Sequence, residues 1–117
     1  MKTKKELKEE YKQMKFRMGV FQVRNTINGK IYVDSSVNLD MIWNRHRTQL
    51  NFGVHPNVEL QQEWNEMGAD NFVYEIVSEI SHREDEVTDY AKEVKQLELM
   101  FIEELKPFGE KGYHNVK

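Results

Sequence analysis

The 117-residue sequence contains no cysteine and only two prolines. Without cysteine, the chain has no disulfide, no thiolate nucleophile and no Cys-ligated zinc site, which fits a reducing compartment. No apolar run approaches the length of a membrane span, and the lysine-rich N-terminus lacks the apolar segment of a signal peptide. We therefore expect a cytoplasmic protein with no membrane partner, long enough to bury a core without cross-links.

Positive charge is scarce outside the N-terminus. Residues 1–17 carry seven Lys or Arg against three Glu, whereas residues 18–117 carry ten against seventeen acidic residues. We expect 1–17 to be a basic helical arm and 18–117 to be the folded domain. Such an acidic body does not attract nucleic acid at long range, so binding would need the arm or a local patch. Alternatively, the arm's Leu7, Tyr11 and Met14 cover the body and its lysines stay in solvent.

Three segments have the composition of β-strands. Residues 19–25 and 30–35 are β-rich runs, and Asn28-Gly29 between them predicts a tight hairpin with positive φ angles. Residues 72–80 alternate in hydrophobicity and predict a third strand. The acidic segment 81–89 is expected to be a solvated connection.

Helical spacing accounts for the rest of the chain. Ser36 or Asn38 is placed to cap a helix that Gly53 ends, Asn57 to cap a second helix that stops before Gly68, and Pro107 to stop a final long one. With the arm, the order is α-β-β-α-α-β-α. This order predicts an α+β domain with a small three-stranded antiparallel sheet flanked by helices.

Two ionisable residues lie on apolar helix faces. His46 shares its face with Leu39, Trp43 and Leu50, and Glu98 follows Val94 on the apolar face of the final helix. A lone histidine in such a place often only packs, and a buried carboxylate must be paired, protonated, metal-bound or at the edge of a cleft. Their presence in one small domain favours a shared polar site.

Several short segments occur in a recognisable order. These are G-V-F at 19–21, Y-V-D at 32–34, WNRH at 43–46, the helical Glu98 and KGYHN at 111–115. Together they resemble a GIY-YIG nuclease domain. The resemblance implies hydrolysis of DNA phosphodiesters on a compact sheet-and-helix fold, with one divalent metal bound by a helical glutamate.

The resemblance assigns roles to three residues. Tyr32 matches the second motif tyrosine, His46 the histidine of the first helix and Glu98 the metal-binding glutamate. The implied cofactor is Mg²⁺ or Mn²⁺, which would polarise the phosphate and stabilise the leaving oxygen while keeping most of its water. Tyr32 and His46 would position or deprotonate the attacking water, for which histidine has a suitable pKa.

The sequence departs from the family at three functional positions. Phe21 replaces the first motif tyrosine, Asp34 the second motif glycine, and Ile42 the arginine that stabilises phosphate charge. Arg45, three residues beyond Ile42, could reach a similar place with its long side chain or could simply be solvated.

Other polar residues are candidates for nucleic-acid contacts. Lys30, Arg45 and Arg47 are candidate phosphate ligands. The tail reads His114-Asn115, so either His114 replaces the family's asparagine or Asn115 is displaced by one residue.

Two hypotheses follow. The three changes favour a domain that binds nucleic acid, with DNA expected, and has weak or lost phosphodiesterase activity. The survival of Tyr32, His46 and Glu98 favours an active metal-dependent endonuclease. Sequence specificity could come from a protein partner, and the sequence leaves the oligomeric state open.

Overall fold

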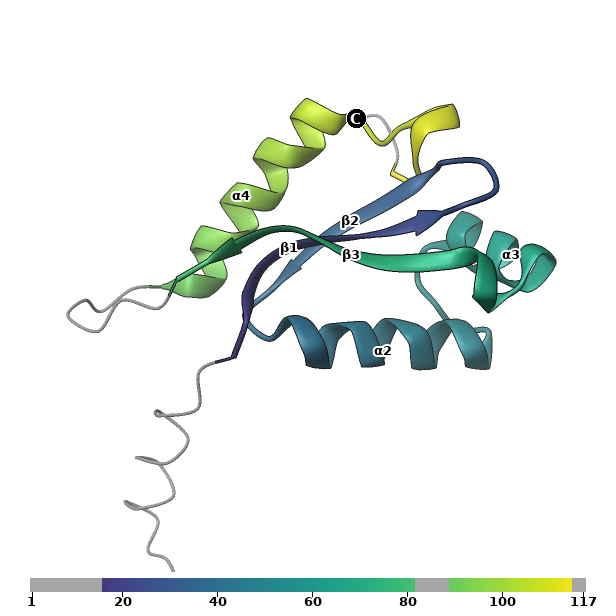
Figure 1. Ribbon diagram of the computed structural model, residues 1–117, viewed down its shortest axis with the longest axis horizontal. Helices are drawn as coiled ribbons and strands as arrows, with labels where there is room; N and C mark the ends of the chain where they lie inside the picture. The colour runs from purple at the N-terminus through teal and green to yellow at the C-terminus, as the bar shows by residue number, and fades with distance from the viewer. Residues whose placement is uncertain (1–15, 82–88, 115–117) are drawn as a thin grey trace, which may run out of the picture.

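The computed structural model describes residues 16–81 and 89–114, and its centre is a three-stranded antiparallel sheet (Figure 1). The strands are β1 (Met18–Asn25), β2 (Ile31–Ser36) and β3 (Phe72–Ile80), in the order β2-β1-β3. β1 therefore pairs on both sides, while β2 and β3 form the two edges. The predicted α+β class and antiparallel sheet are confirmed.

The hairpin between β1 and β2 differs from the predicted tight turn. Only Gly29 in this loop has a positive φ, at 77°. The N–H of Gly29 donates to Asn25 O, and the N–H of Asn25 donates to Lys30 O, which closes a longer loop. The carboxamide oxygen of Asn28 accepts the N–H of Lys30, so Asn28 acts through its side chain and its own φ stays negative.

Within the described residues, three α-helices and two 3₁₀ turns surround the sheet. They are α2 (Leu39–Phe52), α3 (Val58–Met67), η1 (Ala69–Asn71), α4 (Tyr90–Leu105) and η2 (Gly109–Lys111). Asn38, Asn57 and Asp89 cap the α-helices by accepting backbone N–H groups of the first turns. Of the two candidate caps for the first of these helices, the structure therefore selects Asn38. None of the described helices is long and apolar enough to cross a membrane.

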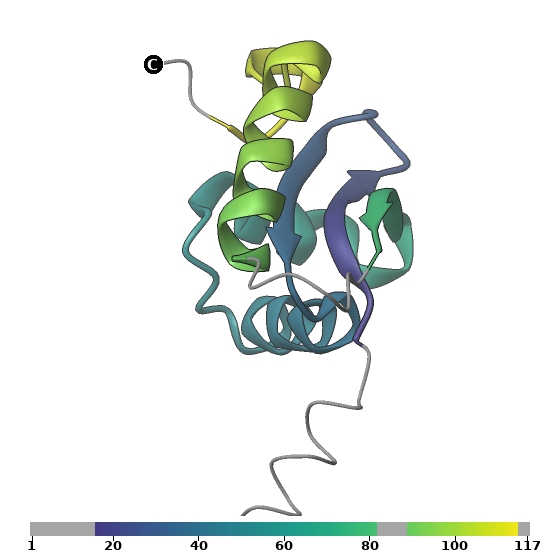
Figure 2. The same cartoon turned by 90° about the vertical axis from the view of Figure 1, so that its left-hand side faces the viewer.

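The helices cover both faces of the sheet (Figures 1 and 2). α2 and α3 lie on one face, where the main core forms, and α4 packs on β1 and β2 from the other side. The buried core residues are Phe21, Val23, Leu39, Leu50, Leu60, Trp64, Phe72 and Tyr113. The predicted basic arm and most of the acidic connection, residues 1–15 and 82–88, lie outside the described residues.

Two glycines permit close backbone approaches near this core. A Cβ at Gly19 would lie 2.0 Å from Ser78 O on β3, and one at Gly112 would lie 2.3 Å from Pro107 O. Gly19 opens the first motif, next to the register shift between Val20 and Phe21. The packing of β1 against β3 therefore explains why glycine is needed there.

Candidate active site

The candidate site is built around the edge strand β2. Tyr32 and Asp34 pair in register with Val23 and Phe21, so their side chains share the sheet face that α2 covers. Ser35 points to the opposite face, toward α4. Groups from α2 and α4 therefore meet around one short strand.

A chain of hydrogen bonds fixes the histidines on the α2 side. The N–H of Asn57 donates to His55 Nδ1 at 3.0 Å, so neutral His55 carries its proton on Nε2. That nitrogen lies 2.8 Å from His46 Nδ1, and His46 Nε2 lies 3.1 Å from Asp34 Oδ2. Neutral His46 is therefore protonated on Nε2 and donates to Asp34, which leaves both of its ring nitrogens engaged.

Burial and hydrogen-bond partners shift the pKa values of His55 and Asp34 in this chain of hydrogen bonds. Burial and the neighbouring His46 lower the pKa of His55 to about 4, so it is neutral at physiological pH. Burial disfavours the carboxylate of Asp34, but the hydrogen bonds from His46 and from the N–H of Ser35 outweigh it and lower its pKa. Asp34 is thus a carboxylate that accepts from the His46 ring and from the N–H of Ser35.

Glu98 approaches β2 from α4 and is 4% exposed. Its Oε1 accepts the Ser35 hydroxyl at 2.8 Å, and its Oε2 lies 2.9 Å from Lys95 Nζ. Burial raises the pKa of Glu98, and the neighbouring Asp34 adds to that rise against the opposing effects of Lys95 and Ser35. Two carboxylates therefore share the site with one ammonium group.

Aromatic rings form the part of the site around Tyr32. Tyr32 stacks on His114 with centroids 5.1 Å apart and meets the rings of His46 and His55 edge-on, each at 5.6 Å. His114 Nε2 accepts the N–H of Val33 at 2.8 Å, which fixes the stack against β2. Burial, with help from Asp34, raises the pKa of Tyr32 to about 12. At neutral pH its hydroxyl is thus a hydrogen-bond donor, not a base.

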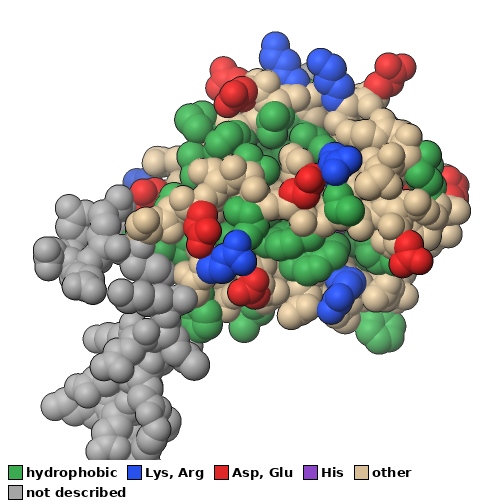
Figure 3. All heavy atoms as spheres, in the orientation of Figure 1, with side chains coloured by type: hydrophobic (Ala, Val, Ile, Leu, Met, Phe, Trp, Pro, Cys, Tyr) green, Lys and Arg blue, Asp and Glu red, His purple; other side chains and the backbone are tan. Residues whose placement is uncertain are grey.

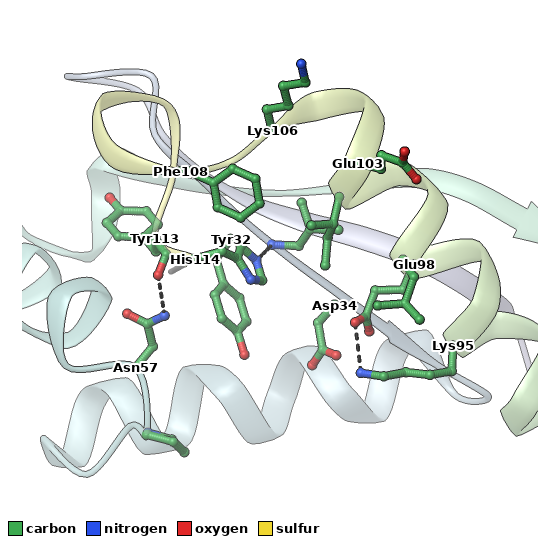
Figure 4. Close-up of a pocket in the computed structure, with 14 residues that line it drawn as sticks. Tyr32, Asp34, Asn57, Lys95, Glu98, Glu103, Lys106, Phe108, Tyr113 and His114 are labelled. Carbon is green, nitrogen blue, oxygen red and sulfur yellow. Dashed lines mark hydrogen bonds and ion pairs between the residues drawn. The ribbon is translucent and has the colours of Figure 1, made fainter. Parts of the chain in front are cut away.

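The site opens into a cavity of about 800 Å³ between β2 and α4 (Figure 4). Tyr32, Asp34, Lys95, Glu98 and His114 line its inner end. Figure 4 shows Asp34 and Glu98 directed into the same part of the cavity. The cavity then continues along α4 past these polar groups.

The structure separates the predicted site residues into two groups. It brings together Phe21, Tyr32, Asp34, His46, Glu98 and His114, with the Phe21 ring 5.6 Å from that of His46. It does not bring in Arg45 or Arg47, which are exposed on α2, the latter bound to Asn44. Lys30 pairs with Glu59 and Glu63 on α3 instead.

Ile42 and Asn115 are the remaining two predicted positions. Ile42 packs against the core cluster and brings no charge. Asn115 lies outside the described residues, while His114 occupies the position beside Tyr32. His114 thus lies in the site through the Tyr32 stack and the Val33 N–H, and both alignments of the tail stay predictions.

Two site residues were not predicted from the sequence. His55 lies in the short loop between α2 and α3, where no periodicity marks it, although a histidine between Gly53 and the cap Asn57 is a weak signal. Lys95 precedes Glu98 by three residues, a spacing that places two helical side chains together, so this pair could have been found.

The donor set suits a loosely held, hard cation. Asp34 and Glu98 carry more negative charge than Lys95 neutralises, and Mg²⁺ binds through one or two carboxylates while retaining water. Within 16–81 and 89–114, no three His, Cys, Asp or Glu side chains are placed to enclose a metal. The residues therefore fit an open site for a divalent cation that keeps part of its water.

Comparison with known proteins supports a nuclease relationship. No family model matches the chain. Over 69 residues, 59% of the chain, it is 35% identical to intron-associated endonuclease 1 of enterobacteria phage T4, and the match covers only 28% of that protein's length.

Two solved structures share the fold. The catalytic domain of homing endonuclease I-TevI has 31% identity and a TM-score of 0.67, over 86% of this chain and 98% of that one. A mutant of the catalytic domain of intron endonuclease I-TevI has 28% identity and a TM-score of 0.65, over 78% and 86%.

Proposed function

The chain belongs to the GIY-YIG nuclease superfamily, and from this membership we propose that it is a DNA-binding member with weak or lost phosphodiesterase activity. Its relatives in the comparisons are endonucleases, two of them described by their catalytic domain. Sequence specificity would come from a protein partner or from a second module.

The observation that carries this proposal is the engagement of His46. A general base needs a free nitrogen lone pair facing the attacking water. His46 Nδ1 already accepts from His55, and Nε2 carries the proton that Asp34 accepts. Asp34, at the motif's glycine position, accepts that proton and holds the ring in an orientation that offers no lone pair to water.

The charge stabiliser is also missing. Ile42 is apolar and packs on the core where the family has an arginine. Removing one donor to a developing oxyanion lowers the rate by about 10²–10³, and removing an arginine finger by about 10³–10⁵. Either loss alone would make turnover slow.

The alternative is an active metal-dependent endonuclease. It is favoured by the presence of Tyr32 and Glu98 on one cavity, by the contact of His46 with the Tyr32 ring and by the ammonium group of Lys95 beside Glu98. Glu98, with Asp34 beside it, would hold Mg²⁺ or Mn²⁺, which supplies charge stabilisation to the scissile phosphate when bound. Tyr32 would donate a hydrogen bond to the attacking water and orient it, and Lys95 would contact the phosphate.

Nicking of supercoiled plasmid with Mg²⁺ or Mn²⁺, together with DNA binding by fluorescence anisotropy, separates the two functions. The proteins to compare are wild type, Glu98→Gln and Glu104→Gln, which changes an exposed carboxylate on the same helix. We expect DNA binding by all three and little or no nicking. Nicking by wild type and Glu104→Gln that Glu98→Gln abolishes would establish the endonuclease, and absence of DNA binding would overturn the proposal.

A further inference from the structure

The outer half of the cavity contains none of the groups discussed above as catalytic. Past Glu98, its apolar lining is Leu99 and Ile102 from α4 and Phe108 from the segment after the helix, and the exposed Glu103 also borders it. Leu99 is 56% exposed, which is unusual for a leucine beside a polar site. An apolar chamber of this kind fits a flat, uncharged group next to the scissile position.

Cationic side chains lie at both ends of this chamber. Lys95, Leu99 and Ile102 occur at i, i+4 and i+7 on one face of α4, and Lys106, the left-handed residue that follows the helix, also lines the cavity. The two lysines are therefore about 16 Å apart along the axis, with the apolar residues between them. Figure 4 shows Lys95 directed to Glu98 at the inner end, while Lys106 extends outward from the opposite rim.

A phosphate can reach Lys95 without displacing Glu98. The ammonium group has three N–H donors, of which Glu98 Oε2 uses one, and the side chain is 61% exposed. Elsewhere the surface offers duplex DNA little attraction, because residues 18–117 are acidic. On the face shown in Figure 3, the described acidic and basic side chains are interspersed. Affinity must then come from local contacts.

We propose that the outer chamber binds one unpaired nucleotide of a DNA strand, with its base among Leu99, Ile102 and Phe108 and its flanking phosphates on Lys95 and Lys106. This inference rests on the proposed function and names its substrate class: single-stranded DNA or a duplex with an unpaired nucleotide. A paired base cannot enter, since its faces are covered by its neighbours in the stack. A free base has an apolar face for a phenyl ring and aliphatic side chains. The volume is within the range of nucleotide-sized ligand sites.

The test is fluorescence anisotropy with a labelled strand of about 12 nucleotides, alone and annealed to its complement, at one fixed salt concentration. We expect the single strand to bind at least about tenfold more tightly than the duplex. Phe108→Ala should weaken single-strand binding about tenfold and leave duplex binding unchanged. Phe52→Ala, which removes a 78% exposed ring at the end of α2, is the matched control.

A second pair of variants tests the same chamber without removing the partly buried ring of Phe108. Leu99→Glu places a negative charge in the chamber, whereas Met100→Glu places one on the next residue, which is 51% exposed and does not line the cavity. We expect only Leu99→Glu to weaken single-strand binding. A strand carrying 2-aminopurine should change its fluorescence on binding wild type and less so with Leu99→Glu.

The outcomes distinguish this inference from the function on which it rests. Equal affinity for strand and duplex, or equal effects of Leu99→Glu and Met100→Glu, would overturn the unpaired-nucleotide site and leave a DNA-binding domain. No binding to either DNA would overturn both.

Discussion

The Nε2 atom of His46 lies 3.1 Å from Oδ2 of Asp34, and the two side chains come from α2 and β2 respectively. Because His55 holds the other ring nitrogen, this contact fixes both the tautomer and the orientation of the imidazole. A glycine at residue 34 would remove the acceptor of the Nε2 proton, while His55 would still donate to Nδ1. The two partners of His46 thus fix its role together.

Restoring two motif residues should restore hydrolysis. Asp34→Gly removes a carboxylate from the position where the phosphate would approach, and Ile42→Arg returns a positive charge to α2, so the double variant should nick plasmid at least about 10²-fold faster than wild type. The single variants should gain less, because each lacks one component. Ile42→Met, which changes the core residue without adding charge, is the control. A double variant no faster than Asp34→Gly with Ile42→Met would show that the charge is not what the site lacks.

The stability of the domain should depend on His55 in mildly acidic solution. Its native pKa is lowered to about 4 from the usual 6.5, so between these values the unfolded chain binds a proton that the native state does not. The contribution of neutral His55 to the free energy of unfolding is therefore fully present above about pH 6.5. It is lost as the pH drops toward 4, by up to about 3 kcal/mol. Urea unfolding of wild type and His55→Gln across this range measures the difference between their free energies of unfolding. This difference should narrow as the pH falls. Parallel curves for the two proteins would contradict the assignment.

Gly112→Ala should destabilise the fold by about 1–3 kcal/mol, because the new methyl group would meet Pro107 backbone atoms at 2.3–2.5 Å. Gly29→Ala is the matched control. Its φ is 77° but nothing lies within 4 Å of the added Cβ, so only the backbone strain of about 1 kcal/mol applies. Denaturant midpoints for the two variants, compared at equal m-values, test the difference. If Gly29→Ala lowered the stability as much as Gly112→Ala, the contact with Pro107 would not be the cause of the loss.

The basic arm should contribute to DNA affinity if its lysines neutralise phosphates. Deleting residues 1–15 would then weaken binding and flatten its dependence on salt, by about one unit of slope for each phosphate that the shortened protein leaves unneutralised. Binding curves at several salt concentrations provide the measurement. Unchanged affinity with lower thermal stability would instead support the alternative, in which the arm covers part of the domain.

The elements of the fold could be predicted because their signals are local. The three strands, the caps Asn38 and Asn57, and the stop before Pro107 follow from residues a few positions apart. The hairpin shows the limit of such signals: the Asn28-Gly29 pair marks a turn, but Asn28 uses its side chain rather than a positive φ. Turn length depends on contacts beyond the dipeptide.

The site was only partly predictable. Tyr32, His46 and Glu98 could be named from the motif, and the structure places Tyr32 and Glu98 on one cavity, with His46 against the Tyr32 ring. That Asp34 binds His46 could not be foreseen, because it requires the distance between a strand and a helix. His55 is still harder to find, since its place in the site depends on how a loop returns between α2 and α3.

Some residues of the site have a second role at the outer edge of β2. Strand edges expose unpaired backbone groups that invite another chain to add on, which leads to aggregation. Here the N–H of Val33 donates to His114, the N–H of Ser35 to the Asp34 carboxylate, and Ile31 O accepts the N–H of Tyr113. These contacts occupy backbone groups on the free edge of β2 and so protect it from pairing with another chain. Selection for solubility alone would therefore retain some of these side chains even in a domain without nuclease activity.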